Sequence, residues 1–139
     1  MERKPSVLMM GLGYIGLPTA ALIASRGLHV TGVDIHQHVI DTINKGQIHI
    51  VEPELDVMVR KAVEGGFLKA VTSPEPADAF LIAVPTPFLP TASEGEIPQP
   101  NLTYIQSAAK SIAKVLKKGD LVILESTSPV GTTEQMAKW

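Results

Sequence analysis

The fold is indicated most clearly by residues 7–16, which run Val7-Leu8-Met9-Met10-Gly11-Leu12-Gly13-Tyr14-Ile15-Gly16. The first four residues are all apolar, which is typical of a short parallel strand that is buried on both faces. From Ile15 to Arg26, small and apolar residues continue through several helical turns, and Gly27 is a natural end for a helix. The stretch therefore predicts a strand, a tight turn and a helix in succession.

A second strand completes this unit. Residues 29–34, His29-Val30-Thr31-Gly32-Val33-Asp34, predict a strand that ends in a carboxylate. Gly11, Gly13 and Gly16 match the pattern G-x-G-x-x-G, and Asp34 follows at the distance of about 20 residues expected for a carboxylate that binds a ribose diol. This combination predicts the dinucleotide-binding half of a Rossmann fold.

Each part of this pattern has a chemical reason. Gly11 permits the tight turn, Gly13 allows the backbone to approach a diphosphate closely, and Gly16 allows the helix to pack on the strand. The start of the helix offers free N–H groups and a partial positive charge to the anion. Asp34 would repel a 2′-phosphate, and the next two residues, Ile35 and His36, supply no arginine to neutralise one, so we expect NAD in preference to NADP. The alternative for Asp34 is a carboxylate that is only solvated.

The remaining sequence predicts one α/β domain over residues 1–139. We expect a doubly wound parallel sheet with helices on both faces. The further elements that we expect are strands at 67–72, 79–84 and 121–124 and helices at 39–44, from the Glu52-Pro53-Glu54 turn to Gly65, from the Asn101 cap to Leu116, and from Gly131 onward. Pro53 is placed near the first helical position, and the last helix is expected to be still in progress at Trp139.

A complete sheet of this kind has about six strands, and this sequence predicts one fewer. We therefore interpret residues 1–139 as the N-terminal fragment of a longer enzyme. Between the fourth strand and Asn101 lies a proline-rich loop. Residues 89–99 are either a surface insertion or a functional loop, and the sequence favours neither interpretation. Pro85-Thr86-Pro87, in contrast, follows a central strand at the sheet edge where ligands bind.

Composition excludes several classes of protein. The net charge is −2 with acids and bases interspersed, which argues against a nucleic-acid partner. The sequence contains no cysteine, so these residues hold no disulfide, thiolate metal site or cysteine nucleophile. We expect the four histidines to be solvated and expect no metal site. The charged start, Met1–Ser6, leads into an apolar run that Gly11 interrupts, so we expect a cytoplasmic protein with no membrane contact.

Several segments together are similar to one enzyme family. The chain resembles the UDP-glucose/GDP-mannose dehydrogenase family in five segments, in order: Gly11–Pro18, Asp34 with its following helix, Ile48–Pro53, Val84–Pro87 and Ser126–Thr132. The resemblance extends over nearly the whole chain. It is greatest to the bacterial branch that oxidises UDP-N-acetyl-D-mannosamine, and the expected substrate rests on that resemblance alone.

The resemblance implies a function and a set of site residues. In this family two NAD molecules in turn oxidise the C6 alcohol of the sugar to a uronate, through a thioester on a cysteine. The turn with Tyr14 and Ile15 would hold the diphosphate, Asp34 the adenosine ribose, and Thr86 would line the nicotinamide side. Thr127 would contact the cofactor and help to position water near the reacting carbon. The alternative for both threonines is that their hydroxyls only satisfy backbone groups at strand ends.

The family's cysteine, its oxyanion-stabilising lysine and asparagine, and most of the UDP-sugar pocket belong to positions that follow residue 139. We therefore expect this chain alone to bind NAD and to turn nothing over. Family resemblance also implies a homodimeric parent enzyme.

Two other functions remain open from the sequence. One is another NAD-dependent dehydrogenase, of the 6-phosphogluconate or hydroxyacyl-CoA type, against which the Ser126–Gly131 segment argues by resemblance. The other is a non-enzymatic nucleotide-sensing module, because a Rossmann fold does not by itself imply catalysis.

Overall fold

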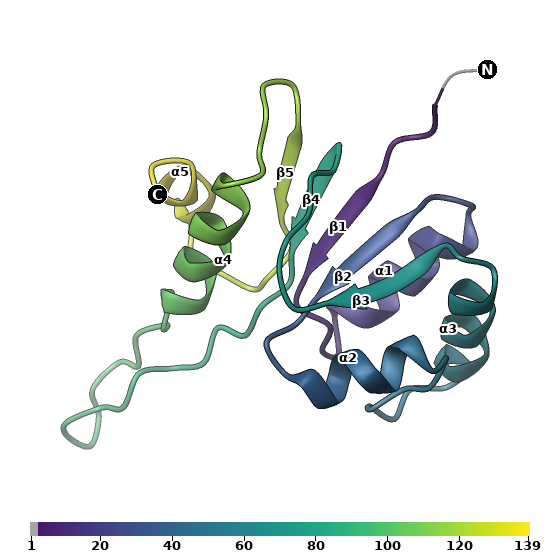
Figure 1. Cartoon of the computed structure of the whole chain (residues 1–139). Coiled ribbons are helices and arrows are strands. Elements are labelled where there is room, and N and C mark those ends of the chain that lie inside the picture. Colours follow the sequence, from purple (N-terminus) through teal and green to yellow (C-terminus); the bar gives the residue numbers. More distant parts are fainter. Residues whose placement is uncertain (1–2) are drawn as a thin grey trace.

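The computed structural model describes residues 3–139 and contains a five-stranded parallel sheet in the order β3-β2-β1-β4-β5 (Figure 1). Met1 and Glu2, the first residues of the charged start, lie outside the described residues. The strands are β1 (Val7–Met10), β2 (Val30–Val33), β3 (Leu68–Val71), β4 (Ala79–Ile82) and β5 (Leu121–Leu124). The helices are α1 (Gly16–Ser25), α2 (Gln37–Asn44), α3 (Leu55–Glu64), α4 (Thr103–Ala113) and α5 (Thr132–Met136).

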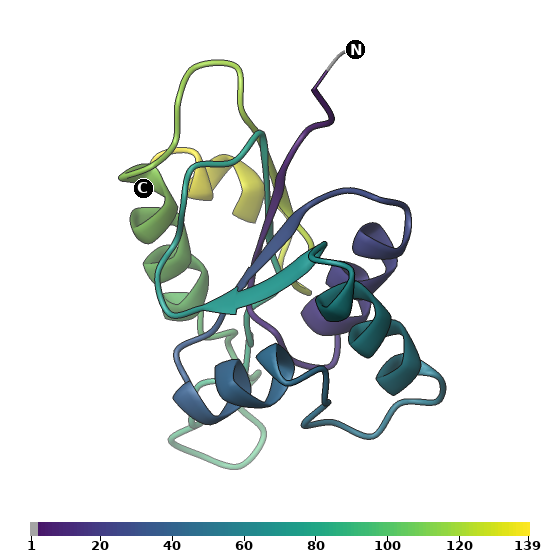
Figure 2. The same ribbon diagram turned by 45° about the vertical axis from the view of Figure 1, so that its right-hand side comes forward.

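The sheet is doubly wound, as the sequence predicts. Helices α1, α2 and α3 cover one face, and α4 and α5 cover the other (Figures 1 and 2). β1 lies in the middle and pairs in parallel with both β2 and β4, so that Val7 is in register with Val30 and with Ala79. The strand order therefore reverses between β1 and β4, and ligands of such sheets bind outside the carboxyl ends of the strands at this point.

Burial explains why the central strands are apolar throughout. All four residues of β1 are buried, with Leu8 facing the α4 side and Met9 the α1 side. On the α4 side, Leu8 packs in one cluster with Phe80 and Ile105, and all three are fully buried. This two-sided burial removes the alternation of polar and apolar residues that a half-exposed strand would show.

Some expected helix ends are wrong. Pro53 is not in the first helical turn, because Glu54 adopts a left-handed conformation (φ 64°) and α3 begins only at Leu55. The last helix ends at Met136 and does not continue through Trp139. Its final N–H groups, on Lys138 and Trp139, donate to carbonyls three residues back, which tightens the chain into a turn. The N-cap residue of α4 is Leu102, one residue later than expected, although Asn101 Oδ1 does accept the N–H of Thr103, the first helical residue, at 3.0 Å.

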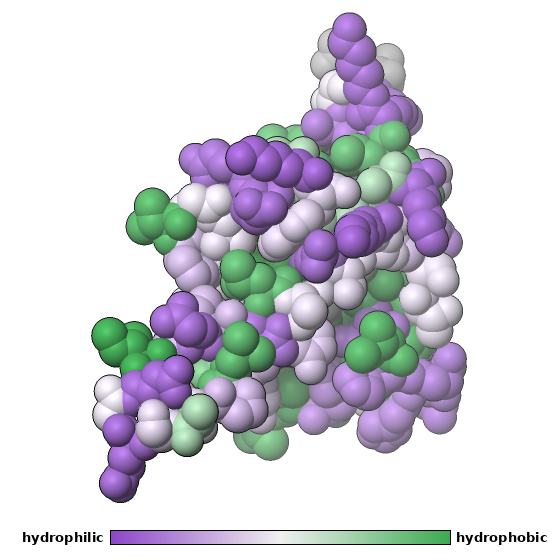
Figure 3. Space-filling view, turned by 90° about the vertical axis from the view of Figure 1, so that its left-hand side faces the viewer, coloured by the Kyte–Doolittle hydropathy of each residue, from purple (hydrophilic) through white to green (hydrophobic). Residues whose placement is uncertain are grey.

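The proline-rich loop forms a narrow, hairpin-like segment. Leu89 N donates to Gln99 O at 2.7 Å, and Phe88 and Pro100 form an antiparallel bridge. This hairpin-like segment projects away from the sheet, below α4 (Figure 1). On the face that carries α4 and α5, apolar side chains lie in separate spots among hydrophilic ones (Figure 3).

No helix within residues 3–139 has the length and apolar character needed to cross a bilayer.

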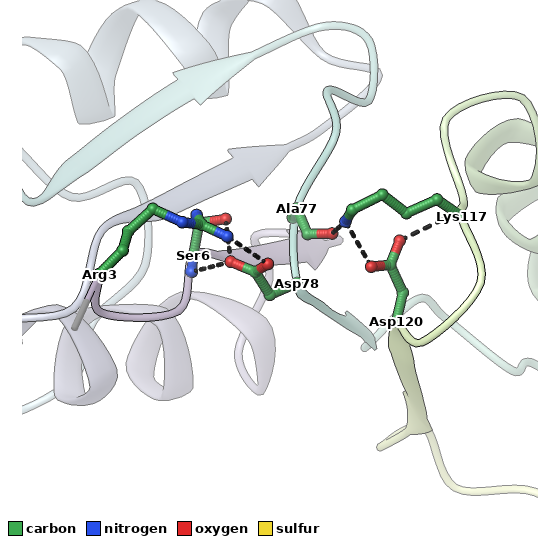
Figure 4. A network of polar contacts seen from close by, with 6 residues as sticks. All are labelled: Arg3, Ser6, Ala77, Asp78, Lys117 and Asp120. Atoms are coloured by element: carbon green, nitrogen blue, oxygen red, sulfur yellow. Dashed lines mark hydrogen bonds and ion pairs between the residues drawn. The ribbon is translucent and has the colours of Figure 1, made fainter.

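Two aspartates tie the amino ends of three strands together (Figure 4). The carboxylate of Asp78, just before β4, accepts hydrogen bonds from Arg3 Nη2 at 2.8 Å and from the backbone N of Ser6 at 2.7 Å. Asp120, just before β5, accepts the N–H of Lys117 at 2.9 Å, and the Lys117 ammonium also reaches Ala77 O at 3.0 Å. These contacts lie at the opposite edge of the sheet from the carboxyl ends of the strands.

These contacts predict an acid-dependent loss of stability. Hydrogen bonds from Arg3 and then Ser6 hold the pKa of Asp78 well below its ordinary value. A lowered folded pKa contributes stability that is complete above the unfolded pKa of about 3.9 and is lost as pH falls through the folded value. We expect the urea midpoint to fall steadily below about pH 4 and to fall less in Asp78→Asn. The control is Asp41→Asn, an exposed aspartate on α2, and an equal fall in all three proteins would contradict this account.

Candidate functional site

The glycine turn joins the end of β1 to the start of α1, and its glycines have different surroundings. A Cβ on Gly11, which has φ 95°, would lie 2.4 Å from the carbonyl oxygen of Ala83, and a Cβ on Gly16 would lie 1.8 Å from the carbonyl oxygen of Gly11. A Cβ on Gly13 would meet nothing within 4 Å. Folding therefore requires Gly11 and Gly16, whereas Gly13 borders open space outside the turn.

The start of α1 is open to an anion. Its N-cap residue, Ile15, makes no side-chain cap, and the first turn contains no acidic residue. Within residues 3–139, the N–H groups of Gly13 and Tyr14 donate to no protein acceptor. Unpaired N–H groups and the positive end of the helix dipole favour a bound anion at this position.

Asp34 lies beside this turn, directly after β2. Its Oδ2 accepts the N–H of Leu12 at 3.1 Å, and its Oδ1 accepts the N–H of His36 at 3.0 Å. Burial raises the pKa of Asp34, but the hydrogen bonds from His36 and Leu12 outweigh burial, so the pKa lies below its ordinary value. The carboxylate is therefore charged at neutral pH, and its exposed fraction is 13%.

The structure corrects the interpretation of His49 as solvated and gives the exposed His36 a polar contact. The ring of His36 contacts Asp34 through Nδ1, 2.8 Å from Oδ1, although the ring itself is exposed. His49 is partly buried, and its Nδ1 is inaccessible and has no partner within residues 3–139. Burial lowers the pKa of His49, and Asp34 is the charge that opposes this effect most. The only signal for His49 in the sequence is its place in the Ile48–Pro53 segment.

The threonines that follow β4 and β5 lie together. Thr86 donates its hydroxyl to the carbonyl oxygen of Thr127 at 2.7 Å, so this hydroxyl satisfies a backbone group, as the alternative interpretation expects. Thr127 is exposed, and within residues 3–139 its own hydroxyl makes no hydrogen bond. Because the strands are parallel and in register, Asp34, Gly11, Thr86 and Thr127 all lie along the carboxyl edge of the sheet.

Glu125 is a further polar residue at this edge. Its Oε1 accepts the hydroxyl of Thr19 from α1 at 2.6 Å, and its Oε2 is buried with no partner within the described chain. The contact joins positions that are 106 residues apart, so no local pattern in the sequence could reveal it.

A separate hollow of about 400 Å³ lies at the amino edge, next to His29 and Phe67. The side-chain amide of Asn44, which also lines it, is already hydrogen-bonded to both backbone groups of Ala70. None of the residues expected to bind the cofactor lines this hollow.

Comparison with known proteins agrees with this geometry. The model of the UDP-glucose/GDP-mannose dehydrogenase family, NAD binding domain, matches residues 5–139. The chain belongs to this family. Membership identifies NAD as the cofactor class of the domain, and it argues against the 6-phosphogluconate and hydroxyacyl-CoA alternatives.

Individual members of the UDP-glucose/GDP-mannose dehydrogenase family are closely similar. UDP-N-acetyl-D-mannosamine dehydrogenase of Campylobacter jejuni is 65% identical over 139 residues, which is 100% of this chain and 33% of the relative. NDP-N-acetyl-D-galactosaminuronic acid dehydrogenase of Ralstonia solanacearum is 64% identical over 96% of this chain and 30% of the relative. The structure of UDP-D-ManNAc dehydrogenase from Pyrococcus horikoshii has a TM-score of 0.86 and 42% identity, covering 96% of this chain and 31% of that one.

The chain thus spans about a third of the length of these relatives. The names of the Campylobacter jejuni and Ralstonia solanacearum relatives contain different sugars, although both are almost equally identical to this chain. The sequence identity of this chain to its relatives therefore does not select the sugar.

Proposed function

We propose that the carboxyl edge of this sheet binds NAD and that the whole protein is an NAD-dependent UDP-sugar 6-dehydrogenase. The observation that carries the binding site is the open space at Gly13, next to the uncapped start of α1 and the charged Asp34. The proposed cofactor-binding residues are Gly11, Gly13, Tyr14, Ile15, Gly16, Asp34, Thr86 and Thr127.

The residues of the turn fit the adenosine diphosphate half of NAD. The N–H groups of Gly13 and Tyr14 are available as donors to phosphate oxygens. Each carboxylate oxygen has two lone pairs, and among residues 3–139 Oδ2 of Asp34 accepts only one hydrogen bond. A ribose hydroxyl therefore has a free acceptor position there. The His36 ring, 69% exposed, is free to move aside from Oδ1 when the ribose binds.

The threonines at the ends of β4 and β5 are assigned to the nicotinamide end. When bound, NAD would accept the hydride that leaves C6 of the sugar. The hydrogen bond from Thr86 fixes the Thr127 carbonyl, and the Thr127 hydroxyl stays available as both donor and acceptor without adding charge. We assign Thr127 the catalytic task of contacting the cofactor and positioning water near the reacting carbon.

For the substrate, we propose UDP-N-acetyl-D-mannosamine, oxidised at C6 to the uronate with two NAD. The names of the Campylobacter jejuni and Pyrococcus horikoshii relatives support this sugar. We further propose that residues 1–139 alone bind NAD without oxidising the sugar, because they contain no cysteine to form a thioester. A cytoplasmic homodimer is the proposed state of the whole enzyme.

The test is NADH formation by the full-length protein with UDP-N-acetyl-D-mannosamine, UDP-N-acetyl-D-galactosamine and UDP-glucose. We expect two NADH per molecule of the mannosamine derivative and slower reaction with the others. Faster reaction with the galactosamine derivative would overturn the proposed sugar. NAD binding with no reduction for any sugar nucleotide would favour the nucleotide-sensing module. The chain of residues 1–139 is expected to bind NAD and form no NADH.

Removal of the charge at Asp34 tests the choice of cofactor. Asp34→Asn keeps an oxygen that accepts the Leu12 N–H, but it loses the charge that attracts ribose hydroxyls and repels a 2′-phosphate. We expect the affinity for NAD to fall about tenfold and the preference for NAD over NADP to narrow. Calorimetric titration with both cofactors measures this, with Asp41→Asn as the control. An unchanged ratio of the two affinities would exclude Asp34 as the ribose carboxylate.

A further inference from the structure

Glu125 lies between two parts of the proposed NAD site, the start of α1 and the segment that follows β5. Along β5, Val122 and Leu124 pack on the α4 side of the sheet, whereas Leu121 and Ile123 are exposed. Side chains alternate between the two faces of a strand, so position 125 continues the row of Leu121 and Ile123. The Glu125 side chain therefore points toward the face that carries α1, and it reaches that helix.

The contact with α1 is a hydrogen bond near the start of the helix. Thr19 donates its hydroxyl to Oε1 of Glu125 at 2.6 Å. A threonine hydroxyl within a helix commonly donates to a carbonyl of the preceding turn, as that of Thr42 does with His38 O at 2.7 Å. The Thr19 hydroxyl instead leaves its own helix. Among the described residues, no other hydrogen bond joins α1 to residues 121–127.

The segment that follows β5 is also fixed to the end of β4. The N–H groups of Glu125 and Ser126 both donate to Ile82 O, at 2.9 and 3.0 Å. The Ser126 hydroxyl donates to Val84 O at 2.9 Å. Thr127 is the next residue in the chain. A shift of Glu125 relative to α1 would therefore move Thr127 with it.

Stability alone does not explain a carboxyl group at this place. Oε2 of Glu125 is buried and has no hydrogen-bond partner within the described part of the chain. An unpaired buried acceptor is destabilising, and an apolar pair of the same shape can be as stable as a hydrogen-bonded pair. The contact is therefore better explained by the geometry that it imposes than by its contribution to folding.

We propose that Glu125 is a positioning residue that, through Thr19, sets the distance between the start of α1 and Thr127. The core fixes α1, because Leu17 and Ala20 on this helix are fully buried. β5 is the last strand of the described sheet and has one exposed face, so the segment after it depends more on this hydrogen bond. With the diphosphate on the glycine turn, the distance decides whether the nicotinamide lies against Thr127. This inference rests on the proposed NAD site and deepens it.

The test compares Thr19→Val and Glu125→Met, which each remove one side of the hydrogen bond at nearly constant volume, with the double variant. Full-length protein is titrated with NAD and with ADP-ribose, which has the diphosphate but no nicotinamide, and urea unfolding is recorded for each variant. We expect each single variant to weaken NAD about tenfold and to leave ADP-ribose unchanged. The double variant should lose no more than either single variant, because both remove the same contact.

Two further variants serve as controls. Glu125→Gln keeps an oxygen that accepts the Thr19 hydroxyl, so it should bind NAD almost as tightly as the unmodified protein. Ser25→Ala is the matched control, because the Ser25 hydroxyl also lies on α1 but donates to Leu22 O, within the helix, at 2.6 Å. It should leave the affinities for NAD and ADP-ribose unchanged.

Each outcome decides the proposal. Equal losses for NAD and ADP-ribose, additive losses in the double variant, a glutamine variant as weak as methionine, or no loss in Thr19→Val would overturn it. If Glu125→Met does not fold, Thr19→Val decides alone, because valine keeps the branched shape of threonine without its donor. If the unmodified protein binds neither NAD nor ADP-ribose, the proposed NAD site fails; if it binds both and the variants match it, only the inference about Glu125 fails.

Discussion

Gly13→Val is expected to abolish detectable NAD binding in a protein that stays folded. A side chain at position 13 would extend into space that is empty of protein atoms within 4 Å. The φ angle of Gly13 is not positive, so an L-residue there meets no backbone strain of the kind found at Gly11. We therefore expect the free energy of unfolding to change by less than about 1 kcal/mol, while the side chain excludes the phosphate oxygens.

The measurement is calorimetric titration with NAD alongside urea unfolding. Gly13→Ala is the graded companion and should retain weak binding, about 100-fold below the unmodified protein, or roughly 2.7 kcal/mol. Gly66→Ala serves as the control for NAD binding: a Cβ there also meets nothing within 4 Å and lies at the opposite edge of the sheet, so NAD affinity should not change, although the φ of 74° makes alanine cost some stability. Full NAD affinity in Gly13→Val would show that the diphosphate does not lie at this turn.

Gly16→Ala is expected to have the largest effect on stability of any single methyl added to the turn. The new Cβ would lie 1.8 Å from the carbonyl oxygen of Gly11 and 2.8 Å from its carbonyl carbon. Both atoms are backbone, and Gly11 is itself held by its N–H, which donates to Val33 O at 2.8 Å. The overlap can be relieved only by moving α1 away from the end of β1.

Movement of α1 would disturb the packing of Leu17, Ala20 and Ala21, all of which are fully buried. We expect a loss of about 4 kcal/mol or more in the free energy of unfolding, or failure of the chain to fold. Urea unfolding and the yield of soluble protein measure this. A stable Gly16→Ala protein would mean that the helix does not pack on the turn as closely as described.

The sequence predicts the fold, and it predicts the glycine turn and Asp34 as candidate site residues, because these depend on local patterns. The apolar run of β1, the glycine spacing and the position of Asp34 at the end of β2 all fall within residues 7–34, and the sheet confirms the fold that they predict. The predicted helix start near Pro53 was wrong for an equally local reason. Glu54 adopts a left-handed conformation, which residues other than glycine rarely adopt, so nothing in the sequence indicated it.

The rest of the site depends on contacts between distant positions. Glu125 meets Thr19 across 106 residues, and Thr86 meets Thr127 across 41. Such pairs become visible only when the strands and helices are placed in space. The roles of Thr86 and Thr127 could be proposed from family resemblance, but their mutual hydrogen bond could not.

The central claim is that the diphosphate of NAD lies on the backbone N–H groups between β1 and α1, with Asp34 holding the adenosine ribose. Hydrogen–deuterium exchange of the protein with and without saturating NAD tests it most directly. The account predicts slower exchange at residues 11–17 and 34–36 and no change at the amino edge, in residues 66–69 and 117–120. Unchanged exchange at residues 11–17 in protein that demonstrably binds NAD would contradict it.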